Sequence, residues 1–317
     1  MLAMTLDEAL NFEWKEVAEP VRKPHEVVIG VKAAAVNRAD LLQKDGCYAS
    51  PPDWPQWCGL EVAGHVLEAP ENSRFRVGDR VCALVGGGGY AEKIAVPEDM
   101  VIPLPEEISM VQGASIPEVW CTAYLNLLLE AGLQPGEVIF IQAGASGVGL
   151  AAIQLAKKMG AKVITTVGSQ AKAEFVKSLG ADIVLNHRTD DILQVIKVSQ
   201  PNVALDCVGG RLMGQCLEYM AFGGRWIMIA SLAGGDTTVN LETVWRKRLR
   251  LIGSTLRSRT SAEKGRIMSA IEQYLPLFAA GKLVTHIHAV FPMQEVETAH
   301  AILRRAENIG KVVLTLE

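Results

Sequence analysis

The sequence lacks the features of several protein classes. Its six cysteines include no C-x-x-C pair, which argues against a disulfide framework and a zinc-ribbon site and favours reduced thiols. No uninterrupted apolar run approaches the roughly 20 residues of a membrane-spanning helix, and the acidic N-terminal residues do not suit a signal peptide. Aromatic residues make up only 6% of the chain, so no aromatic cage identifies a ligand. These absences predict a cytoplasmic protein without membrane association.

Positive charge is also not in excess. The formal net charge of −4 gives no general attraction to nucleic acid, so an anionic partner needs a local basic site and the partner is expected to be a small molecule. One basic cluster beside Trp245 leaves RNA binding open as a lesser alternative, although such clusters are more often solvated faces or local ion pairs. The cluster consists of Arg246, Lys247, Arg248, Arg250, Arg257 and Arg259.

What is present is a change of pattern along the chain, which is long enough for about two domains. Residues 1–115 carry short β-branched runs punctuated by glycine and proline, which predicts a compact, mostly β domain. From Glu137 onward strands alternate with helices, which predicts an α/β domain with a doubly wound parallel sheet, a Rossmann fold, over residues 116–257. Because that unit is then complete, residues 258–317 are expected to return to the first domain.

A glycine-rich turn opens the predicted parallel sheet. The apolar run 138–142 leads into Ala143-Gly-Ala-Ser-Gly-Val-Gly149, and a helical pattern follows directly. Glycines at such a turn let the backbone approach a pyrophosphate, and the helix N-terminus offers N–H groups and a favourable dipole. The spacing Gly-x-x-Gly-x-Gly departs from the commonest order, and a turn without a ligand is the alternative. The context favours dinucleotide binding by Gly144, Ser146, Gly147, Val148 and Gly149.

The end of the next predicted strand indicates which dinucleotide. A site for NAD usually carries an acidic residue about 20 residues past the glycines, but this chain has Gly168-Ser169 there, followed by Lys172. A serine can donate to a 2′-phosphate and a lysine can neutralise it, so NADPH is the predicted cofactor. His187 and Arg188 could close over the same phosphate, or could form a solvated loop.

Further motifs extend over nearly the whole chain. They are Asn37-Arg-Ala-Asp-Leu41, Gly59-Leu-Glu-Val-Ala-Gly64, Val77-Gly-Asp-Arg-Val81, Ile116-Pro-Glu118, Asp206-Cys-Val-Gly-Gly210 and Asn308-Ile-Gly-Lys-Val-Val-Leu314. With the glycine turn, they resemble the zinc-free quinone oxidoreductases of the medium-chain dehydrogenase/reductase superfamily, especially the tumour-suppressor-inducible quinone reductase branch. The resemblance implies a GroES-like catalytic domain. It also assigns to the cofactor cleft Thr122, Asn186, Gly209, Ser231, Ser254, Leu256 and Asn308.

Differences from the zinc-containing members of that superfamily predict a protein without zinc. The chain has Asn37 where those members have their first cysteine ligand, and Leu60 where they have a histidine ligand. The cysteine-rich lobe that holds structural zinc is also missing, because residues 81–95 contain only Cys82. His65 is out of register with the lost ligand, and a metal site needs three or four ligands.

The loss of zinc limits the chemistry. Alcohol oxidation needs stabilisation of an alkoxide, which a metal provides well. A quinone or an enone is already electron-poor, so hydride transfer to it needs mainly a held geometry and some stabilisation of the developing oxyanion. These considerations predict an NADPH:quinone reductase, with an enoyl or alkenal reductase as the alternative and an RNA-binding, crystallin-like protein as a lesser one.

Three residues are candidates for catalysis. Asn37 can donate an amide N–H to a carbonyl oxygen, and Tyr48 can hydrogen-bond and stack on a flat ring. The resemblance places both near the nicotinamide. As alternatives, Asn37 could simply cap the helix that begins near Arg38, and Tyr48 could cover the domain surface. Ser146 can touch the cofactor and tune the geometry of hydride transfer.

Two other polar residues and the quaternary structure complete the expectations. Asp40 is expected to support the loop or the first helical turn, and Cys207 to act as a small buried hydrophobe. By resemblance the protein is a homodimer, joined along an edge strand near Arg225–Ala230 or Leu249–Ser254, although either run could equally be an inner strand.

Overall fold

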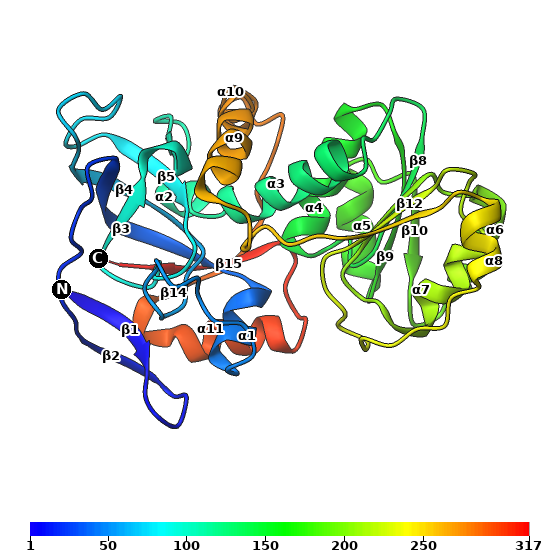
Figure 1. Ribbon diagram of the computed structural model, residues 1–317, viewed down its shortest axis with the longest axis horizontal. Helices are drawn as coiled ribbons and strands as arrows, with labels where there is room; N and C mark the ends of the chain where they lie inside the picture. Colours follow the sequence, from blue (N-terminus) through cyan, green and yellow to red (C-terminus); the bar gives the residue numbers. More distant parts are fainter. Residues whose placement is uncertain (317) are drawn as a thin grey trace. The chain divides into compact units, whose positions relative to one another are not determined.

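A computed structural model describes residues 1–316, and the chain divides into two compact units (Figure 1). Unit 1 consists of Met1–Cys121 together with the chain from Leu256 onward, and unit 2 is Thr122–Thr255. The division falls inside helix α3 (Pro117–Tyr124). The limits inferred from the sequence, after residues 115 and 257, stay a prediction for the domain boundaries.

Unit 2 is built on a six-stranded parallel sheet. In spatial order its strands are β10 (Ile183–Asn186), β9 (Lys162–Val167), β8 (Val138–Ile141), β11 (Val203–Asp206), β12 (Arg225–Met228) and β13 (Arg250–Gly253). In chain order this is 3-2-1-4-5-6, the order of a Rossmann sheet, with the switch point between β8 and β11. The predicted fold class is therefore confirmed for this unit.

Helices cover both faces of this sheet, α4 and α5 on one side and α6 and α7 on the other (Figure 1). The helices of unit 2 are η2 (Leu125–Glu130, a π-helix), α4 (Gly147–Lys158), α5 (Gln170–Ser178), α6 (Ile192–Ser199), α7 (Gly210–Leu217) and α8 (Leu241–Arg246). The inner strands are almost continuously apolar because both of their faces are buried. On one face Phe140, Ile164 and Trp226 pack with Ile196 and Met213 from the covering helices.

The position of each strand decides between the two predicted dimer seams. Strand β12 lies between β11 and β13, so the run Arg225–Ala230 is an inner strand and that alternative was wrong. Strand β13 is the edge of the sheet, and most of its residues are exposed. Of the two runs, only Leu249–Ser254 lies at an edge of the sheet, and β10 forms the opposite edge.

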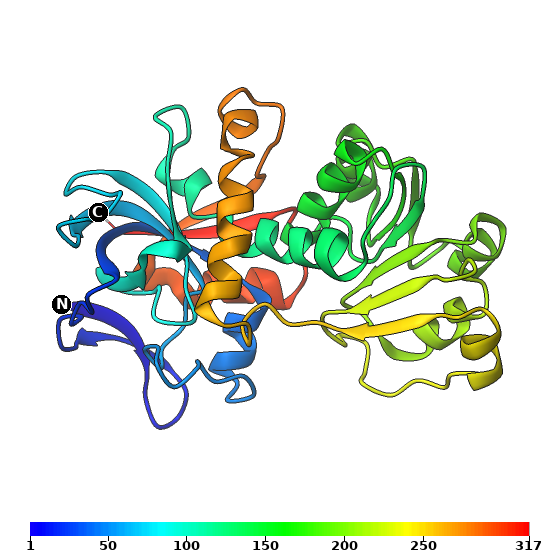
Figure 2. The same cartoon turned by 45° about the horizontal axis from the view of Figure 1, so that its top comes forward.

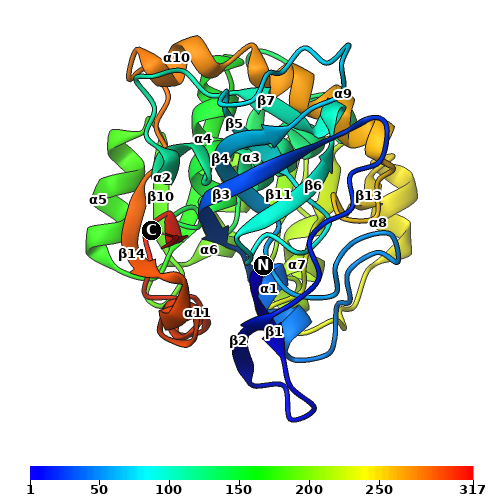
Figure 3. The same ribbon diagram turned by 90° about the vertical axis from the view of Figure 1, so that its left-hand side faces the viewer.

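Unit 1 is mostly β-structure. Its main sheet has the order β14 (Ile287–Pro292), β15 (Lys311–Thr315), β3 (Glu26–Val36), β4 (Glu61–Glu68), β5 (Arg80–Leu84) and β7 (Val101–Pro103), while β6 (Lys93–Pro97) pairs with β3. A second sheet joins β1 (Leu2–Leu6) to β2 (Phe12–Glu16). Strand β15 pairs with β3, so residues 311–315 extend a sheet whose first strand in the chain is residues 26–36. Figure 3 shows β3, β4 and β5 from the side of this unit.

Short helices surround the sheet of unit 1. They are α1 (Arg38–Lys44), η1 (Glu98–Met100), α2 (Met110–Gly113), α9 (Ser261–Glu272), α10 (Leu275–Ala279), η3 (Met293–Glu295) and α11 (Val296–Arg304). Helix α9 packs against η1 and β7, and its course is clearest in Figure 2. Helices α1 and α11 are in contact. Within residues 1–316 no helix combines the length and the apolar character needed to cross a membrane.

Candidate functional site

The glycine turn of unit 2 packs too closely for side chains. A Cβ on Gly144 would lie 2.1 Å from Thr165 Oγ1 on β9, and one on Gly149 would lie 2.4 Å from the carbonyl oxygen of Ala143. Ser146 caps helix α4, because its Oγ accepts a hydrogen bond from the Gly149 N–H at 3.0 Å. The turn therefore places the N-terminus of α4 close to the end of β8. There the backbone N–H groups and the helix dipole favour the binding of an anion.

The other predicted cofactor residues of unit 2 gather at the same edge of the sheet. Parallel strands end at one edge, and each of five strands ends at or just before one or more of these residues. They are Gly168, Ser169 and Lys172 after β9, Asn186 and His187 at β10, Gly209 after β11, Ser231 after β12 and Ser254 after β13. In open α/β sheets, ligands bind outside the carboxyl ends of the strands.

The loops after β9 and β10 come together at Gly168. A Cβ on Gly168 would lie 2.9 Å from His187 Cε1 and 3.8 Å from Arg188 Nε, so both basic side chains lie beside this glycine. Ser169 caps helix α5, with its Oγ accepting from the Lys172 N–H at 3.4 Å. A capping serine still has its own hydroxyl hydrogen to donate. The end of β9 thus carries hydrogen-bond donors and basic groups and no carboxylate.

A buried carboxylate orders the loop after β11. Asp206 is fully buried, and its Oδ1 accepts from the Gln142 side chain at 2.8 Å and from the Val208 and Gly209 N–H groups at 2.7 and 3.0 Å. Its Oδ2 accepts from Trp226 Nε1 at 2.9 Å. Gly209 has φ of +66°, a conformation that glycine adopts readily. The sequence motif identified this loop but not the role of Asp206, which joins β8, β12 and the loop.

Ser254 provides an independent sign that a ligand binds at this edge. The residue is 8% exposed, and its buried Oγ has no hydrogen-bond partner within residues 1–316. Buried hydroxyls almost always have a partner, which a bound ligand can supply. The unsatisfied Ser254 hydroxyl and the helix N-terminus at the glycine turn are both suited to contacts with a dinucleotide.

In unit 1, Asn37 belongs to a buried ionic cluster. Its Nδ2 donates to Ala35 O at 3.1 Å and to Glu61 Oε1 at 3.0 Å, and its Oδ1 accepts from Lys311 Nζ at 2.6 Å. Lys311 also pairs with Glu61 at 2.7 Å, and these two side chains are 4% and 0% exposed. Both amide hydrogens of Asn37 are therefore already donated inside the protein. Donation to a substrate requires one of these two bonds to open.

Asp40 organises the start of helix α1. Its Oδ2 accepts from the Asn37 backbone N–H and its Oδ1 from the Gly59 N–H, both at 2.8 Å. It supports the first turn, as expected. Burial raises the pKa of Asp40 to about 6, against the lowering effect of these bonds and of the Lys311 and Arg257 charges.

Glu118 completes the cluster. It belongs to the Ile116-Pro-Glu118 motif, which by itself indicates no role for this carboxyl. Its backbone N–H donates to Glu61 Oε2 at 2.8 Å. Within residues 1–316 its own carboxyl forms no hydrogen bond or ion pair, and the residue is half-buried. Burial, reinforced by the nearby Glu61 charge, raises the pKa of Glu118 to about 8. Glu118 is thus a largely neutral acid at pH 7.

Tyr48 lies in an irregular loop, residues 45–57, which we call the Tyr48 loop. Arg257 donates to the Tyr48 carbonyl at 2.8 Å, and its guanidinium carbon lies 4.8 Å from the centre of the Tyr48 ring. Arg257 is only 7% exposed. Its place in the predicted basic cluster was therefore wrong, because the side chain is buried in unit 1.

Three further members of the basic cluster form local bonds. Arg246 pairs with Glu242 at 2.6 Å, Lys247 donates to the carbonyl oxygens of Glu218 and Met220, and Arg259 pairs with Glu263. No observation in the structure favours the RNA-binding alternative.

The remaining predicted residues lie at element ends. Thr122 is 8% exposed on α3, and Leu256, which is 6% exposed, begins the chain's return to unit 1. Asn308 Nδ2 donates to Gly310 O at 2.7 Å and so shapes the turn before β15. Cys207 is half-buried, and thus less enclosed than expected.

No group of three metal-binding side chains occurs among the described residues. His65 lies on β4, paired with Gly30 and Arg80 of the neighbouring strands. Neither His65 nor Cys82 has the neighbours of a metal ligand in residues 1–316. None of the six cysteines of that range forms a disulfide.

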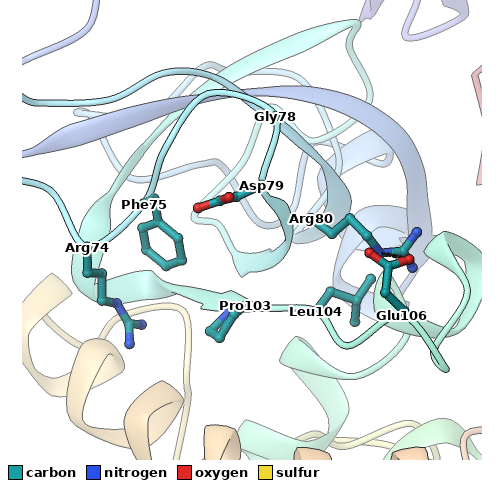
Figure 4. Close-up of a pocket in the computed structure, with 8 residues that line it drawn as sticks. All are labelled: Arg74, Phe75, Gly78, Asp79, Arg80, Pro103, Leu104 and Glu106. Carbon is teal, nitrogen blue, oxygen red and sulfur yellow. Dashed lines mark ion pairs between the residues drawn. The ribbon is translucent and has the colours of Figure 1, made fainter.

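A surface pocket of about 470 Å³ in unit 1 contains none of the predicted site residues (Figure 4). Its arginine charges are balanced, because Arg80 pairs with Glu106 at 3.6 Å and Arg74 pairs with Glu272 at 2.9 Å. We therefore assign it no role in the site. It is lined by Arg74, Phe75, Gly78, Asp79, Arg80, Pro103, Leu104 and Glu106.

Comparison with known proteins agrees with both units. The family model described as an alcohol dehydrogenase GroES-like domain matches residues 23–106, and the one described as a zinc-binding dehydrogenase matches residues 147–273. These matches confirm the predicted combination of a GroES-like domain with a Rossmann domain.

Relatives match over almost the full length. Human quinone oxidoreductase is 32% identical over 308 residues, which cover 95% of this chain and 92% of that protein. Among solved structures, a quinone oxidoreductase of Pseudomonas syringae is 28% identical with a TM-score of 0.87, and all of both chains is covered. The CurK enoyl reductase is 29% identical with a TM-score of 0.87, covering 100% of this chain and 99% of that one.

Proposed function

The chain belongs to the quinone oxidoreductases of the medium-chain dehydrogenase/reductase superfamily, and we propose that it reduces quinones with NADPH and without a metal. The observation that carries this proposal is the arrangement at the carboxyl edge of the unit 2 sheet. The glycine turn, the unsatisfied Ser254 hydroxyl and the basic loops around Gly168 all lie at this edge.

The residues of unit 2 bind the cofactor through its phosphates. Backbone N–H groups of Gly147 and Val148 at the start of α4 hold the diphosphate, and Gly149, whose own N–H is bonded to Ser146 Oγ, keeps the turn tight. The Ser169 hydroxyl and the Lys172 ammonium hold a 2′-phosphate, with the basic side chains beside Gly168 closing over it. By resemblance, the other contacts from unit 2 come from Thr122, Gly144, Ser146, Asn186, Gly209, Ser231 and Ser254. The resemblance also assigns Leu256 and Asn308, which belong to unit 1, to the cofactor.

The residues of unit 1 orient the acceptor. A bound nicotinamide dinucleotide supplies the hydride. The Tyr48 ring stacks on a flat acceptor, and its hydroxyl donates to the acceptor oxygen on which negative charge develops. Asn37 is the second donor, once one of its present bonds is exchanged for the substrate. Its amide is polarised by the Lys311 ammonium on Oδ1, which makes it a stronger donor.

The donors around Asn37 support metal independence. An amide and the apolar Leu60 stand where the resemblance places cysteine and histidine ligands, and the Asn37 oxygen already binds an ammonium. A zinc site needs thiolate, imidazole or carboxylate ligands in a tetrahedral set. An enoyl reductase is the second candidate, supported by the similarity to the CurK enzyme.

A substrate panel tests this function. Loss of NADPH absorbance is followed by stopped flow with ortho- and para-quinones, alkenals and a simple alcohol, repeated with NADH and after chelation. We expect fast oxidation by quinones that chelators do not change, with NADPH preferred over NADH. A strict preference for alkenals would establish the enoyl reductase instead, and chelator-sensitive alcohol oxidation would refute the metal-free mechanism.

Ser169→Asp is expected to reverse the cofactor preference. Aspartate also caps a helix, so α5 is retained, but its charge repels a 2′-phosphate and accepts from a 2′-hydroxyl. We expect the ratio of kcat/KM for NADPH over NADH to fall at least about tenfold, equivalent to about 1.4 kcal/mol. Thr260→Asp, at the cap of α9 in unit 1, is the matched control. An unchanged ratio in Ser169→Asp would show that this loop does not hold the phosphate.

A homodimer and a cytoplasmic location remain predictions. The exposed edge strand β13 supports a dimer in which two copies pair along Leu249–Ser254 across a two-fold axis. Sedimentation velocity at micromolar concentration should then give twice the 34.2 kDa mass of one chain. A species with the single-chain mass would exclude this dimer.

A further inference from the structure

Arg257 has no part in the proposed chemistry, yet its guanidinium forms four hydrogen bonds, three of which reach the Tyr48 loop or the helix before it. Its Nε donates to Gly86 O at 3.0 Å, and its two terminal nitrogens donate to Tyr48 O, Ser50 Oγ and Gln43 Oε1. All four acceptors are neutral. Within residues 1–316 the guanidinium forms no ion pair with a carboxylate.

A buried cation without a carboxylate partner is costly. Arg257 is 7% exposed, and burial lowers the pKa of its guanidinium from the usual value. Burial of a charge is tolerated only where hydrogen bonds replace its lost hydration. The planar guanidinium donates in several fixed directions at once, which a lysine ammonium cannot reproduce. The four bonds therefore account for an arginine at this position.

The bonds of Arg257 converge on one loop. Two of them reach the Tyr48 loop itself, at Tyr48 and Ser50, and a third reaches Gln43 in the helix that precedes it. Gln43 in turn donates to Ser50 Oγ and to Gln56 O, each at 3.0 Å, so both ends of the loop are tied to one pair of side chains. The guanidinium also lies over the Tyr48 ring.

The segment that carries Arg257 is itself anchored. Lys264 is 3% exposed, and its ammonium donates to the Arg257 carbonyl at 2.9 Å. This bond ties the residue to helix α9. Arg257 thus connects the return segment of the chain to a loop about 200 residues earlier, with sequence separations of 209 to Tyr48 and 207 to Ser50.

We propose that Arg257 is a positioning residue that holds the Tyr48 loop in the conformation presenting the Tyr48 ring to a flat acceptor. The identity of the acceptor rests on the proposed function. The restraint of the Tyr48 loop by Arg257 does not. A loop that is held before binding loses less entropy when the acceptor stacks on it. Loosening the loop therefore weakens acceptor binding more than it slows the chemical step.

The test compares two conservative substitutions of equally buried arginines. Arg257→Lys keeps the charge but loses most of the four bonds. Arg225→Lys is the control, because Arg225 is also 7% exposed and lies in unit 2, bonded to Ala131 O and paired with Glu137 at 2.7 Å. We expect Arg257→Lys to raise KM for a para-quinone about tenfold with kcat within about twofold, whereas Arg225→Lys leaves KM unchanged.

Two further readouts separate positioning from general destabilisation. Hydrogen exchange of residues 45–57, measured without substrate, should accelerate in Arg257→Lys and not in Arg225→Lys. In a Tyr48→Ala background the KM effect of Arg257→Lys should disappear, because the ring it positions is gone. Unchanged exchange, or an equal KM effect with and without Tyr48, would overturn the inference. If the wild-type protein does not reduce quinones, the proposed function fails. The exchange measurement still tests whether Arg257 restrains the Tyr48 loop.

Discussion

Lys311→Met is expected to lower the free energy of unfolding by about 3–5 kcal/mol. The Lys311 ammonium is 4% exposed and binds Glu61 Oε1 at 2.7 Å, Asn37 Oδ1 at 2.6 Å and Val36 O at 2.9 Å. Removing it leaves the Glu61 carboxylate, which is 0% exposed, without a counter-charge. Breaking a buried pair from one side is far more costly than losing a surface pair, because the remaining charge cannot be hydrated.

Urea unfolding of the purified variant measures this loss, and two comparisons interpret it. Lys282→Met removes an exposed lysine from the same unit and should change stability by less than about 0.5 kcal/mol. Adding Glu61→Gln to Lys311→Met should restore part of the lost stability, because no unpaired charge then remains. If Lys311→Met lowered the free energy of unfolding as little as Lys282→Met, Glu61 would not be left as an unpaired buried charge when Lys311 is removed.

Glu118→Gln is expected to stabilise the protein increasingly as pH rises from about 5 to about 8. The pKa of Glu118 is raised from 4.5 to about 8, so the folded protein binds this proton more tightly than the unfolded chain does. The resulting stability is complete below about pH 4.5 and is lost as pH rises through about 8, at up to about 1.4 kcal/mol per pH unit. Because Glu118 is half-buried, solvent screening reduces this slope.

The difference in unfolding free energy between Glu118→Gln and the wild type is measured at pH 5, 6.5 and 8. Asp40, with a pKa raised to about 6, gives both proteins a loss in the same direction, so the difference reports Glu118 together with its interaction with Asp40. Glu107→Gln, at an exposed site in unit 1, is the control and should give a constant difference. A constant difference for Glu118→Gln as well would show that its carboxyl ionises normally in the folded protein.

The cofactor site illustrates what local pattern can predict. The order strand, glycine turn and helix is encoded within residues 138–158, and the alternation that follows allows few topologies. The carboxyl ends of parallel strands must share one edge, so residues placed after successive strands meet whatever the side-chain packing. His187 and Arg188 lie beside Gly168 because β9 pairs with β10. From the sequence, these two residues could equally have formed a solvated loop.

The acceptor side could not be predicted in the same way. The partners of the Asn37 side chain are Glu61, 24 residues away, and Lys311, 274 residues away. A local sequence pattern therefore cannot show that the amide of Asn37 is already hydrogen-bonded. Arg257 reads as part of a basic run because a sequence shows charge but not burial. The raised pKa of Glu118, on helix α3, likewise depends on burial beside the Glu61 carboxyl on strand β4.

The two kinds of domain, the Rossmann sheet, the dinucleotide turn and the resemblance to quinone oxidoreductases could be predicted from the amino-acid sequence, because they depend on periodicity and on short motifs. The satisfied polar groups, the buried charges and the edge strands of the sheet became known from the folded chain alone. The physical reason is range: turn and strand propensities act between near neighbours, whereas desolvation and ion pairing depend on every residue that folding brings to the same place.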